Sequence, residues 1–235
     1  MKNNIAVGSV FAIAISVCAL SSEPAQAQAQ KLTIANGARI NPTADYPGWC
    51  TLGAIGYDDQ DNLVGITAGH CDDTTDGDGG PIYLETNRAF GPIGQTVRTN
   101  RAYAYDYQII LFDKNKVTPS KYGPAIQIDS LCATNEPASG LFGGEIACKD
   151  GQTTGLTCGL VLSKSGGMFR NMALSYSGDS GGPVVVDDTQ LCGITVRAGV
   201  VVGGIPYATE YISIHQILND IPSGTPGHGF QPVTF

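Results

Sequence analysis

The sequence has few charged side chains, few histidines and no cluster of basic residues. Of its 235 residues, 14% are Asp, Glu, Lys or Arg, only three are His, and the formal net charge at pH 7 is −8. Proteins that bind a nucleic-acid backbone or an anionic membrane surface need clustered Lys and Arg. The composition therefore excludes both kinds of partner. It also argues against long surface helices, which are usually rich in charged residues.

The sequence also lacks the spacings of the common metal sites. No two cysteines are arranged as CxxC, and the three histidines lie far apart. The stretch 72–80 is acidic and rich in glycine, as calcium loops are, but it has no distal Glu of the EF-hand type. A solvated loop is the better interpretation, and neither a metal nor another cofactor is expected.

Glycine and proline are plentiful, and the apolar residues occur in short runs. The chain has 31 Gly and 13 Pro, and 42% of its residues are hydrophobic, enough for one large β domain or two small ones. Turn residues separate apolar runs that predict strands at 51–57, 63–67, 81–84, 94–98, 107–112, 156–163, 168–174, 183–186 and 191–196. Such regularly spaced short strands are typical of barrels or sandwiches.

One helix is predicted near the end of the chain. Apolar residues at positions i, i+3, i+4 and i+7 form a stripe there, at Ile214, Ile217, Leu218 and Ile221. His215 falls outside this stripe and is expected at the surface. The segment 222–235 alternates Pro and Gly with little to bury. We therefore expect a loosely ordered tail, in which His228 has no identifiable partner.

The first 29 residues have the pattern of a secretion signal. Lys2 supplies a positive charge, an apolar run follows from residue 5 to 20, and small residues at 25–29 offer cleavage sites. The apolar run is shorter than the roughly 20 residues that a membrane span needs. We therefore expect 1–29 to be a cleaved signal peptide, and the mature protein to be extracellular and not attached to a membrane.

Cleavage would remove Cys18 and leave an even number of cysteines. In an exported protein an even number predicts a disulfide framework, and six cysteines allow fifteen pairings. The six are Cys50, Cys71, Cys132, Cys148, Cys158 and Cys192. The residues alone leave the pairing open.

The most informative motif is Gly-Asp-Ser-Gly-Gly-Pro at residues 178–183. A serine hydroxyl is a weak nucleophile unless a base within hydrogen-bond reach accepts its proton. Ser180 lies in this glycine-rich turn, His70 follows an apolar strand, and Asp106 stands directly before another. The order His, Asp, Ser along the chain is that of chymotrypsin, and differs from that of subtilisin and the α/β-hydrolases. We therefore predict that these three residues are catalytic.

Other segments extend the pattern over nearly the whole chain after residue 30. Residues 34–40 are similar to the start of a streptogrisin mature enzyme, and residues 148–159 to the cysteine-bearing hairpin of α-lytic protease. The segments 50–53 and 67–71 are similar to the same enzymes in their residues and in the spacing between them. The chain thus resembles the secreted bacterial serine proteases of the chymotrypsin fold, and these motifs together are far more specific than the serine turn alone.

The resemblance implies an all-β fold of two six-stranded antiparallel β-barrels, with a catalytic cleft between them and a C-terminal helix. The first barrel would comprise 30–118 and carry His70 and Asp106. The second, with the helix, would comprise 119–221 and carry Ser180, and a Pro/Gly-rich tail would follow at 222–235. The resemblance also implies the disulfides Cys50–Cys71, Cys132–Cys148 and Cys158–Cys192.

The roles of the site residues follow from the same resemblance. Ser180 would attack the scissile carbonyl, His70 would act as base and then as acid, and Asp106 would orient the imidazole. The backbone N–H groups of Gly178 and Ser180 would form the oxyanion hole. Substrate would contact Leu174, Ser175, Tyr176, Ser177, Thr195, Val196, Arg197 and Ala198.

These substrate residues give only a general expectation of specificity. The base of the pocket, near Leu174, has no Asp, which argues against a preference for Lys or Arg. A medium-sized residue before the scissile bond is expected. Arg197 would favour an acidic residue if it faces substrate, although a solvated strand residue is the simpler interpretation.

The chain departs from the resembling enzymes in three respects. No long pro-region separates the predicted signal from residue 34, so folding without that helper is expected. The cation that neutralises Asp179 is uncertain, because the family's Arg is matched by Gln152, with Arg170 and Lys149 as the other candidates. Val196 replaces a Ser that bonds the catalytic Asp, and Ala198 replaces a Gly beside the substrate backbone.

The function predicted from these features is that of a secreted serine endopeptidase, a monomer with protein or peptide substrates. Two alternatives belong to other classes. A catalytically impaired protease-fold protein would bind peptides in the same cleft, and an esterase would use the same three residues on esters.

Overall fold

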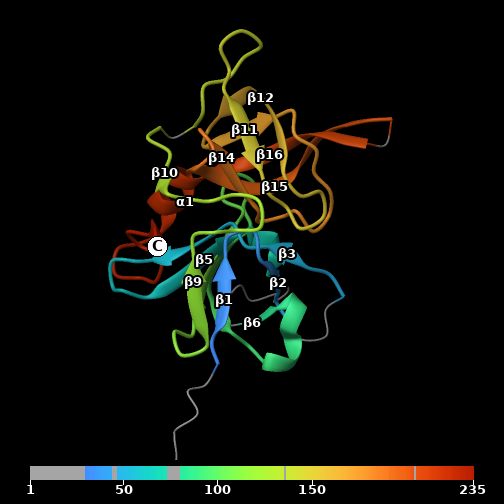
Figure 1. Ribbon diagram of the computed structural model, residues 1–235. Helices are drawn as coiled ribbons and strands as arrows, with labels where there is room; N and C mark the ends of the chain where they lie inside the picture. The colour runs from blue at the N-terminus through green and yellow to red at the C-terminus, as the bar shows by residue number, and fades with distance from the viewer. Residues whose placement is uncertain (1–29, 44–46, 73–79, 135, 204) are drawn as a thin grey trace, which may run out of the picture.

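The computed structural model describes residues 30–43, 47–72, 80–134, 136–203 and 205–235, and the polypeptide forms two packed β-sheet halves (Figure 1). The predicted signal peptide and most of the acidic stretch 72–80 lie outside the described residues. None of the helices in the described part of the chain is long and apolar enough to cross a membrane.

The first half is an eight-stranded antiparallel sheet in the order β17-β4-β5-β8-β7-β6-β2-β3. Its strands are β2 (Arg39–Asn41), β3 (Cys50–Thr51), β4 (Ala54–Tyr57), β5 (Leu63–Thr67), β6 (Pro81–Leu84), β7 (Gly94–Asn100), β8 (Tyr107–Phe112) and β17 (Gln231–Pro232). Only Leu52 and Gly53 separate β3, at one end of the sheet, from β4, next to the other end, so the sheet curves round on itself. Beside it, β1 (Leu32–Ala35) pairs in parallel with β9 (Val117–Ser120).

The second half is a closed barrel. Its six antiparallel strands are β11 (Ile146–Lys149), β12 (Thr157–Ser165), β13 (Met168–Asn171), β14 (Pro183–Val186), β15 (Gln190–Val202) and β16 (Ile205–Ser213). Pairing between β15 and β16 closes the ring, and β10 (Ser130–Leu131) adds to β15 in parallel. β15 and β16 continue beyond the barrel as a projecting hairpin (Figure 1). The fold is thus the predicted chymotrypsin-like pair of β-barrels.

The predicted strands and helix are present in the described residues. The run 51–57 is divided between β3 and β4, and Gly53 between them packs so closely that a Cβ there would lie 2.5 Å from the carbonyl oxygen of Gly181. The helix α1 (Ile214–Asp220) buries Ile214 and Ile217, as its apolar stripe predicts. The strand β16 was not predicted, since Thr209 and Glu210 interrupt its apolar pattern although both are buried.

The tail is ordered by the first barrel, so the expectation of a loose segment was wrong. β17 pairs with β4, and the side chains of Phe230 and Val233 are buried. The tail approaches this strand at Gly56, where a Cβ would lie 2.0 Å from the carbonyl oxygen of Gln231. His228 does have a partner, because its Nδ1 lies 2.7 Å from Asp59 Oδ2. Two buried apolar side chains are enough to order this short segment, because it pairs with the edge of β4 and packs closely against Gly56.

His215 in α1 is not simply a surface residue. Its ring is half-buried, and Nε2 lies 2.6 Å from the carbonyl oxygen of Cys132. The imidazole therefore links the helix to the segment after β10.

One of the three expected disulfides is present and the other two were wrongly paired. Cys50 bonds Cys71, as expected. Cys148 bonds Cys158 because the register of β11 and β12 places these two residues directly opposite each other, with Cα atoms 4.0 Å apart. The pairing of β10 with β15 brings Cys132 next to Cys192 instead, with a Cα separation of 4.9 Å. Strand register therefore decides the pairing of these four cysteines.

Candidate active site

The three predicted catalytic residues meet where the two barrels face each other. His70 lies in a short 3-10 turn (Gly69–Cys71) after β5, Asp106 directly precedes β8, and Ser180 lies in the turn before β14. His70 Nδ1 is 2.8 Å from Asp106 Oδ2, and His70 Nε2 is 2.7 Å from Ser180 Oγ. The backbone N–H of His70 also donates to Asp106 Oδ1 over 2.8 Å.

The turn that carries His70 depends on a close backbone approach. A Cβ at Gly69 would lie 2.0 Å from the carbonyl oxygen of Asn100, so only glycine allows the turn to pack against β7. The disulfide between Cys50 and Cys71 fixes the other side of the turn. The imidazole is therefore held from both directions.

The contact with Asp106 favours one tautomer of the His70 imidazole. The Asp106 side chain is 9% exposed, and both of its oxygens face His70, whereas the His70 side chain is 43% exposed. A carboxylate at Nδ1 stabilises the tautomer with the proton on Nδ1, which leaves Nε2 free to accept the Ser180 proton. This arrangement can activate a serine hydroxyl.

The turn 178–182 presents two backbone N–H groups beside Ser180. Within the described part of the chain, the N–H groups of Gly178 and Ser180 donate to no protein acceptor, while those of Asp179, Gly181 and Gly182 are all bonded. Gly178 has φ +96°, and a Cβ there would lie 2.5 Å from Trp49 Nε1. Two unpaired donors next to a nucleophile are the requirement for stabilising an oxyanion.

A buried ion pair holds this turn. Lys149 Nζ lies 3.0 Å from Asp179 Oδ2, and both side chains are fully buried. The N–H groups of Thr153 and Thr154 donate to Oδ1, and that of Tyr176 donates to Oδ2. Burial alone would raise the pKa of the Asp179 carboxyl, but the N–H of Tyr176, the Lys149 ammonium and Thr154 together hold it below its usual value. Burial lowers the pKa of Lys149, against the opposing effect of Asp179.

Lys149 is therefore the cation that the sequence left undecided. Gln152, which was matched with the family's Arg, donates its side-chain amide to the carbonyl oxygen of Gly37 instead. Arg170, the remaining candidate, pairs with Glu210. The position matched to the family's Arg therefore does not supply the cation, because the residue that reaches Asp179 directly follows Cys148 on β11, three positions earlier. Its place on a strand that pairs with β14 was the missing information.

Of the eight predicted substrate residues, only Ser177 lines the cavity that contains His70 and Ser180. Of the others, residues 174–176 precede the turn 178–182 along the chain and residues 195–198 belong to β15. Ser175, Thr195 and Val196 are buried, whereas Tyr176 and Ala198 are exposed. The backbone carbonyl of Leu174 accepts a hydrogen bond from the Thr157 hydroxyl over 2.9 Å.

Arg197 already has a carboxylate partner. Its Nη1 lies 2.8 Å from Glu210 Oε2, while Arg170 binds the other oxygen of the same buried carboxylate at 2.7 Å. The Arg197 guanidinium also stacks over the ring of Tyr103 at 4.3 Å and donates to the Tyr103 carbonyl. The expectation of a solvated strand residue was therefore wrong, because Arg197 links the second barrel to a loop of the first.

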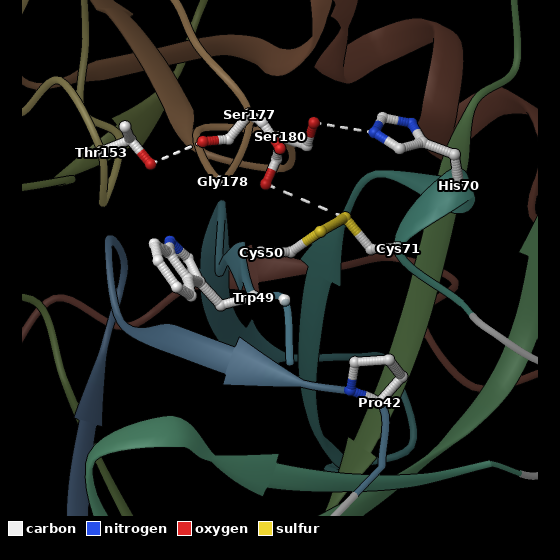
Figure 2. Close-up of a pocket in the computed structure, with 10 residues that line it drawn as sticks. Pro42, Trp49, Cys50, His70, Cys71, Thr153, Ser177, Gly178 and Ser180 are labelled. Atoms are coloured by element: carbon white, nitrogen blue, oxygen red, sulfur yellow. Dashed lines mark hydrogen bonds between the residues drawn. A yellow bond between two sulfur atoms is a disulfide. The ribbon is translucent and has the colours of Figure 1, made fainter. Parts of the chain in front are cut away.

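A cavity of about 630 Å³ opens beside His70 and Ser180 (Figure 2). Its lining includes residues that the sequence did not single out, namely Pro42, Gly48, Trp49 and Thr153. Trp49 belongs to no recognisable motif. It directly precedes Cys50, and the expected Cys50–Cys71 disulfide was the one feature of the sequence that could have placed Trp49 near His70. Within the described ranges, no group of three or more His, Cys, Asp or Glu side chains is arranged to hold a metal ion.

Solved structures share this fold. Thermobifida fusca protease A aligns with a TM-score of 0.65 and 21% identity, covering 87% of this chain and 100% of that one. Nocardiopsis protease aligns with a TM-score of 0.61 and 20% identity, covering 80% and 96%. The chymotrypsin of Cellulomonas bogoriensis aligns with a TM-score of 0.59 and 20% identity, covering 87% of this chain and 100% of that one. The fold is that of the bacterial chymotrypsin-like serine proteases.

Sequence relatives come from mycobacteria. No family model matches the chain. The uncharacterized proteins Rv1815 and MT1863, from two strains of Mycobacterium tuberculosis, are each 33% identical over 218 residues, which covers 86% of this chain and 90% of theirs. The chain belongs to the same family as these two proteins, and its fold is that of the chymotrypsin-like serine proteases.

Proposed function

We propose that the protein is a secreted serine endopeptidase that cleaves peptide bonds through an acyl-enzyme. The observation that carries the proposal is the hydrogen-bonded line from Asp106 through His70 to Ser180, at 2.8 and 2.7 Å, which ends beside two unpaired N–H groups. Nucleophile, base, orienting carboxylate and oxyanion donors are the parts that acyl transfer needs.

The proposed reaction has two halves. Ser180 Oγ attacks the scissile carbonyl carbon while His70 Nε2 takes the hydroxyl proton, and the resulting oxyanion accepts from the N–H groups of Gly178 and Ser180. The C–N bond then breaks as His70 returns the proton to the leaving amine. In the second half, water attacks the acyl-enzyme, His70 accepts its proton, and Ser180 is released with the proton restored. Asp106 stabilises the imidazolium in both halves.

Secretion is part of this proposal. Three disulfides are typical of proteins that fold in an oxidising compartment. The sequence pattern of residues 1–29 predicts an export signal. Together they support an extracellular protein, which we propose acts as a monomer on protein or peptide substrates.

Cleavage of a mixed peptide library by the mature protein tests the proposal, with new N-termini identified by mass spectrometry. We expect discrete cleavage sites, at most a minority of them after Lys or Arg, and no cleavage by Ser180→Ala. A second serine variant, Ser223→Ala in the exposed part of the tail, should cleave like the wild type. Cleavage that persists in Ser180→Ala, or no cleavage by folded wild type, would contradict the proposal.

A peptide-binding role without catalysis is the second candidate. Within the described residues, the Asp106 carboxylate accepts hydrogen bonds from His70 alone, and Val196 stands where the resembling enzymes have a hydroxyl donor. Tight binding of library peptides without turnover would favour this candidate. Turnover of esters but not of peptides would instead favour an esterase.

A further inference from the structure

We propose that the cavity beside His70 receives the residue that follows the scissile bond, and that Trp49 makes the enzyme select a bulky apolar residue there. This inference rests on the proposed endopeptidase function. It assigns selectivity to the leaving-group side of the substrate, whereas the sequence pointed only to residues 174–177 and 195–198.

The position of His70 indicates which part of the substrate, on one side of the scissile bond or the other, the cavity receives. In acyl transfer, Nε2 gives its proton to the leaving amine, so the leaving group must lie beside the imidazole. His70 and the neighbouring Cys50–Cys71 disulfide line the cavity, whereas residues 195–198 of β15 do not. The cavity therefore lies on the leaving-group side of Ser180, away from residues 195–198, which the resemblance places beside the substrate backbone.

The described lining of the cavity is more apolar than polar. Pro42, Trp49 and the disulfide line it (Figure 2), and among the described residues His70 is the one titratable side chain that does so. The hydroxyl of Thr153 is already committed, because it donates to the carbonyl oxygen of Ser177 over 2.6 Å. A charged side chain entering this space would lose water without meeting an opposite charge on the described residues that line it. An aromatic or branched aliphatic side chain would be favoured, and the volume is in the range of known ligand pockets.

Trp49 is a fixed wall of this space. The Arg39 guanidinium stacks over its ring at 4.4 Å, and Arg39 is in turn bonded to the carbonyl oxygen of Gln152 at 3.4 Å. The indole N–H packs against Gly178, where a Cβ would lie 2.5 Å from Nε1. An indole held in this way loses little side-chain freedom when a substrate residue packs on it, so the contact contributes fully to selection. Its packing against the oxyanion turn also places the selected residue next to the reacting atoms.

Partitioning of the acyl-enzyme measures this selectivity without the rest of a peptide. An acyl-peptide ester forms the acyl-enzyme, and added amino-acid amides compete with water for it. The amine nitrogen attacks the acyl carbon, the bond to Ser180 Oγ breaks, and His70 transfers the amine proton to that oxygen. The ratio of amide product to acid product then reports binding on the leaving-group side alone.

We expect phenylalanine amide and leucine amide to be at least about tenfold more effective than glycine, lysine or glutamate amide. Trp49→Ala should reduce the phenylalanine-to-glycine ratio to within about threefold of one, and Trp49→Phe should retain most of the preference. Phe142→Ala, which alters a fully exposed aromatic residue, is the matched control and should keep the wild-type ratio.

Each outcome decides between the two proposals. An acyl-enzyme that forms normally but partitions without preference, or a preference that Trp49→Ala retains, overturns the subsite and leaves the endopeptidase proposal standing. No acyl-enzyme on Ser180 overturns both. If Trp49→Ala does not fold, the ratios measured with the five amides for the wild type and for Trp49→Phe still test the proposed subsite.

Discussion

The two barrels hold their proposed catalytic residues by different means. In the first barrel, His70 is fixed by a glycine approach at Gly69 and by the neighbouring Cys50–Cys71 disulfide, and Asp106 accepts hydrogen bonds from His70. In the second barrel, the turn with Ser180 is held by the fully buried ion pair between Lys149 and Asp179. One half of the site thus depends on covalent and steric constraints, and the other on buried charge.

This difference predicts which half fails when its support is removed. Loss of one member of a buried ion pair leaves a charge without a partner in a low-dielectric interior, which is strongly destabilising. Loss of a disulfide mainly increases the freedom of the unfolded chain and leaves the native contacts in place. The serine half should therefore respond in both stability and reactivity, and the histidine half chiefly in stability.

The largest effect is expected for Lys149→Met. The change leaves Asp179 charged and buried without its cation, so the free energy of unfolding should fall by about 3–5 kcal/mol. Because Asp179 anchors the oxyanion turn, reactivity of the folded fraction toward a serine-directed probe should fall by about 100-fold. Urea unfolding and probe kinetics measure the two effects.

Lys114→Met is the control for this prediction. Lys114 pairs with Asp61 at 2.7 Å, but both side chains are well exposed, so the loss should stay below about 1 kcal/mol. Equal losses in the two variants would show that the buried pair is not what holds the serine turn.

A smaller effect is expected when Cys50 and Cys71 are both replaced by Ser. The bond joins residues 21 positions apart, and a loop of this length contributes roughly 3 kcal/mol by the chain-entropy argument. Probe reactivity of the folded fraction should fall by less than about tenfold, since the hydrogen bonds of His70 to Asp106 remain. A loss of reactivity as large as that of Lys149→Met would erase the distinction between the two halves.

The smallest effect is expected at high pH, from Tyr107 beside Asp106. Burial and the hydrogen bond to Asp220 raise the pKa of Tyr107 to about 12, although Arg98 opposes this. Because the unfolded phenol ionises near pH 10, the stability contributed by this shift is complete below about pH 10 and is lost as the pH rises toward 12. The loss should be about 2–3 kcal/mol, and Tyr107→Phe should lack it.

Urea unfolding at pH 8, 10 and 12 for wild type and Tyr107→Phe measures this prediction. The difference between the two proteins isolates the phenol from other groups that titrate in the same range. Parallel curves for the two proteins would mean that Tyr107 does not stabilise the start of β8 in its neutral form.

Much of the fold was predictable because its signals are local. Short apolar runs between turn residues predicted most strands, and the stripe from Ile214 to Ile221 predicted α1. The GDSGGP turn and its partners His70 and Asp106 could be named for the same reason, since each stands beside a recognisable strand or motif.

The rest could not be predicted because it depends on strand register and close approach. The bond between Cys148 and Cys158 requires knowing that they are opposite each other on β11 and β12. The order of the tail depends on Gly56, and the role of Trp49 depends on the geometry of the Cys50 segment. Lys149 was one of three candidates until the pairing of β11 with β14 placed it under Asp179.

Labelling of the mature protein with a fluorophosphonate, followed by mass mapping of the adduct, tests the account most directly. The probe reacts only with a serine whose base and oxyanion donors are assembled. The account predicts one adduct, on Ser180, that is absent in Ser180→Ala and strongly slowed in Lys149→Met. A folded, disulfide-bonded protein that takes no label, or takes it at another serine, would contradict it.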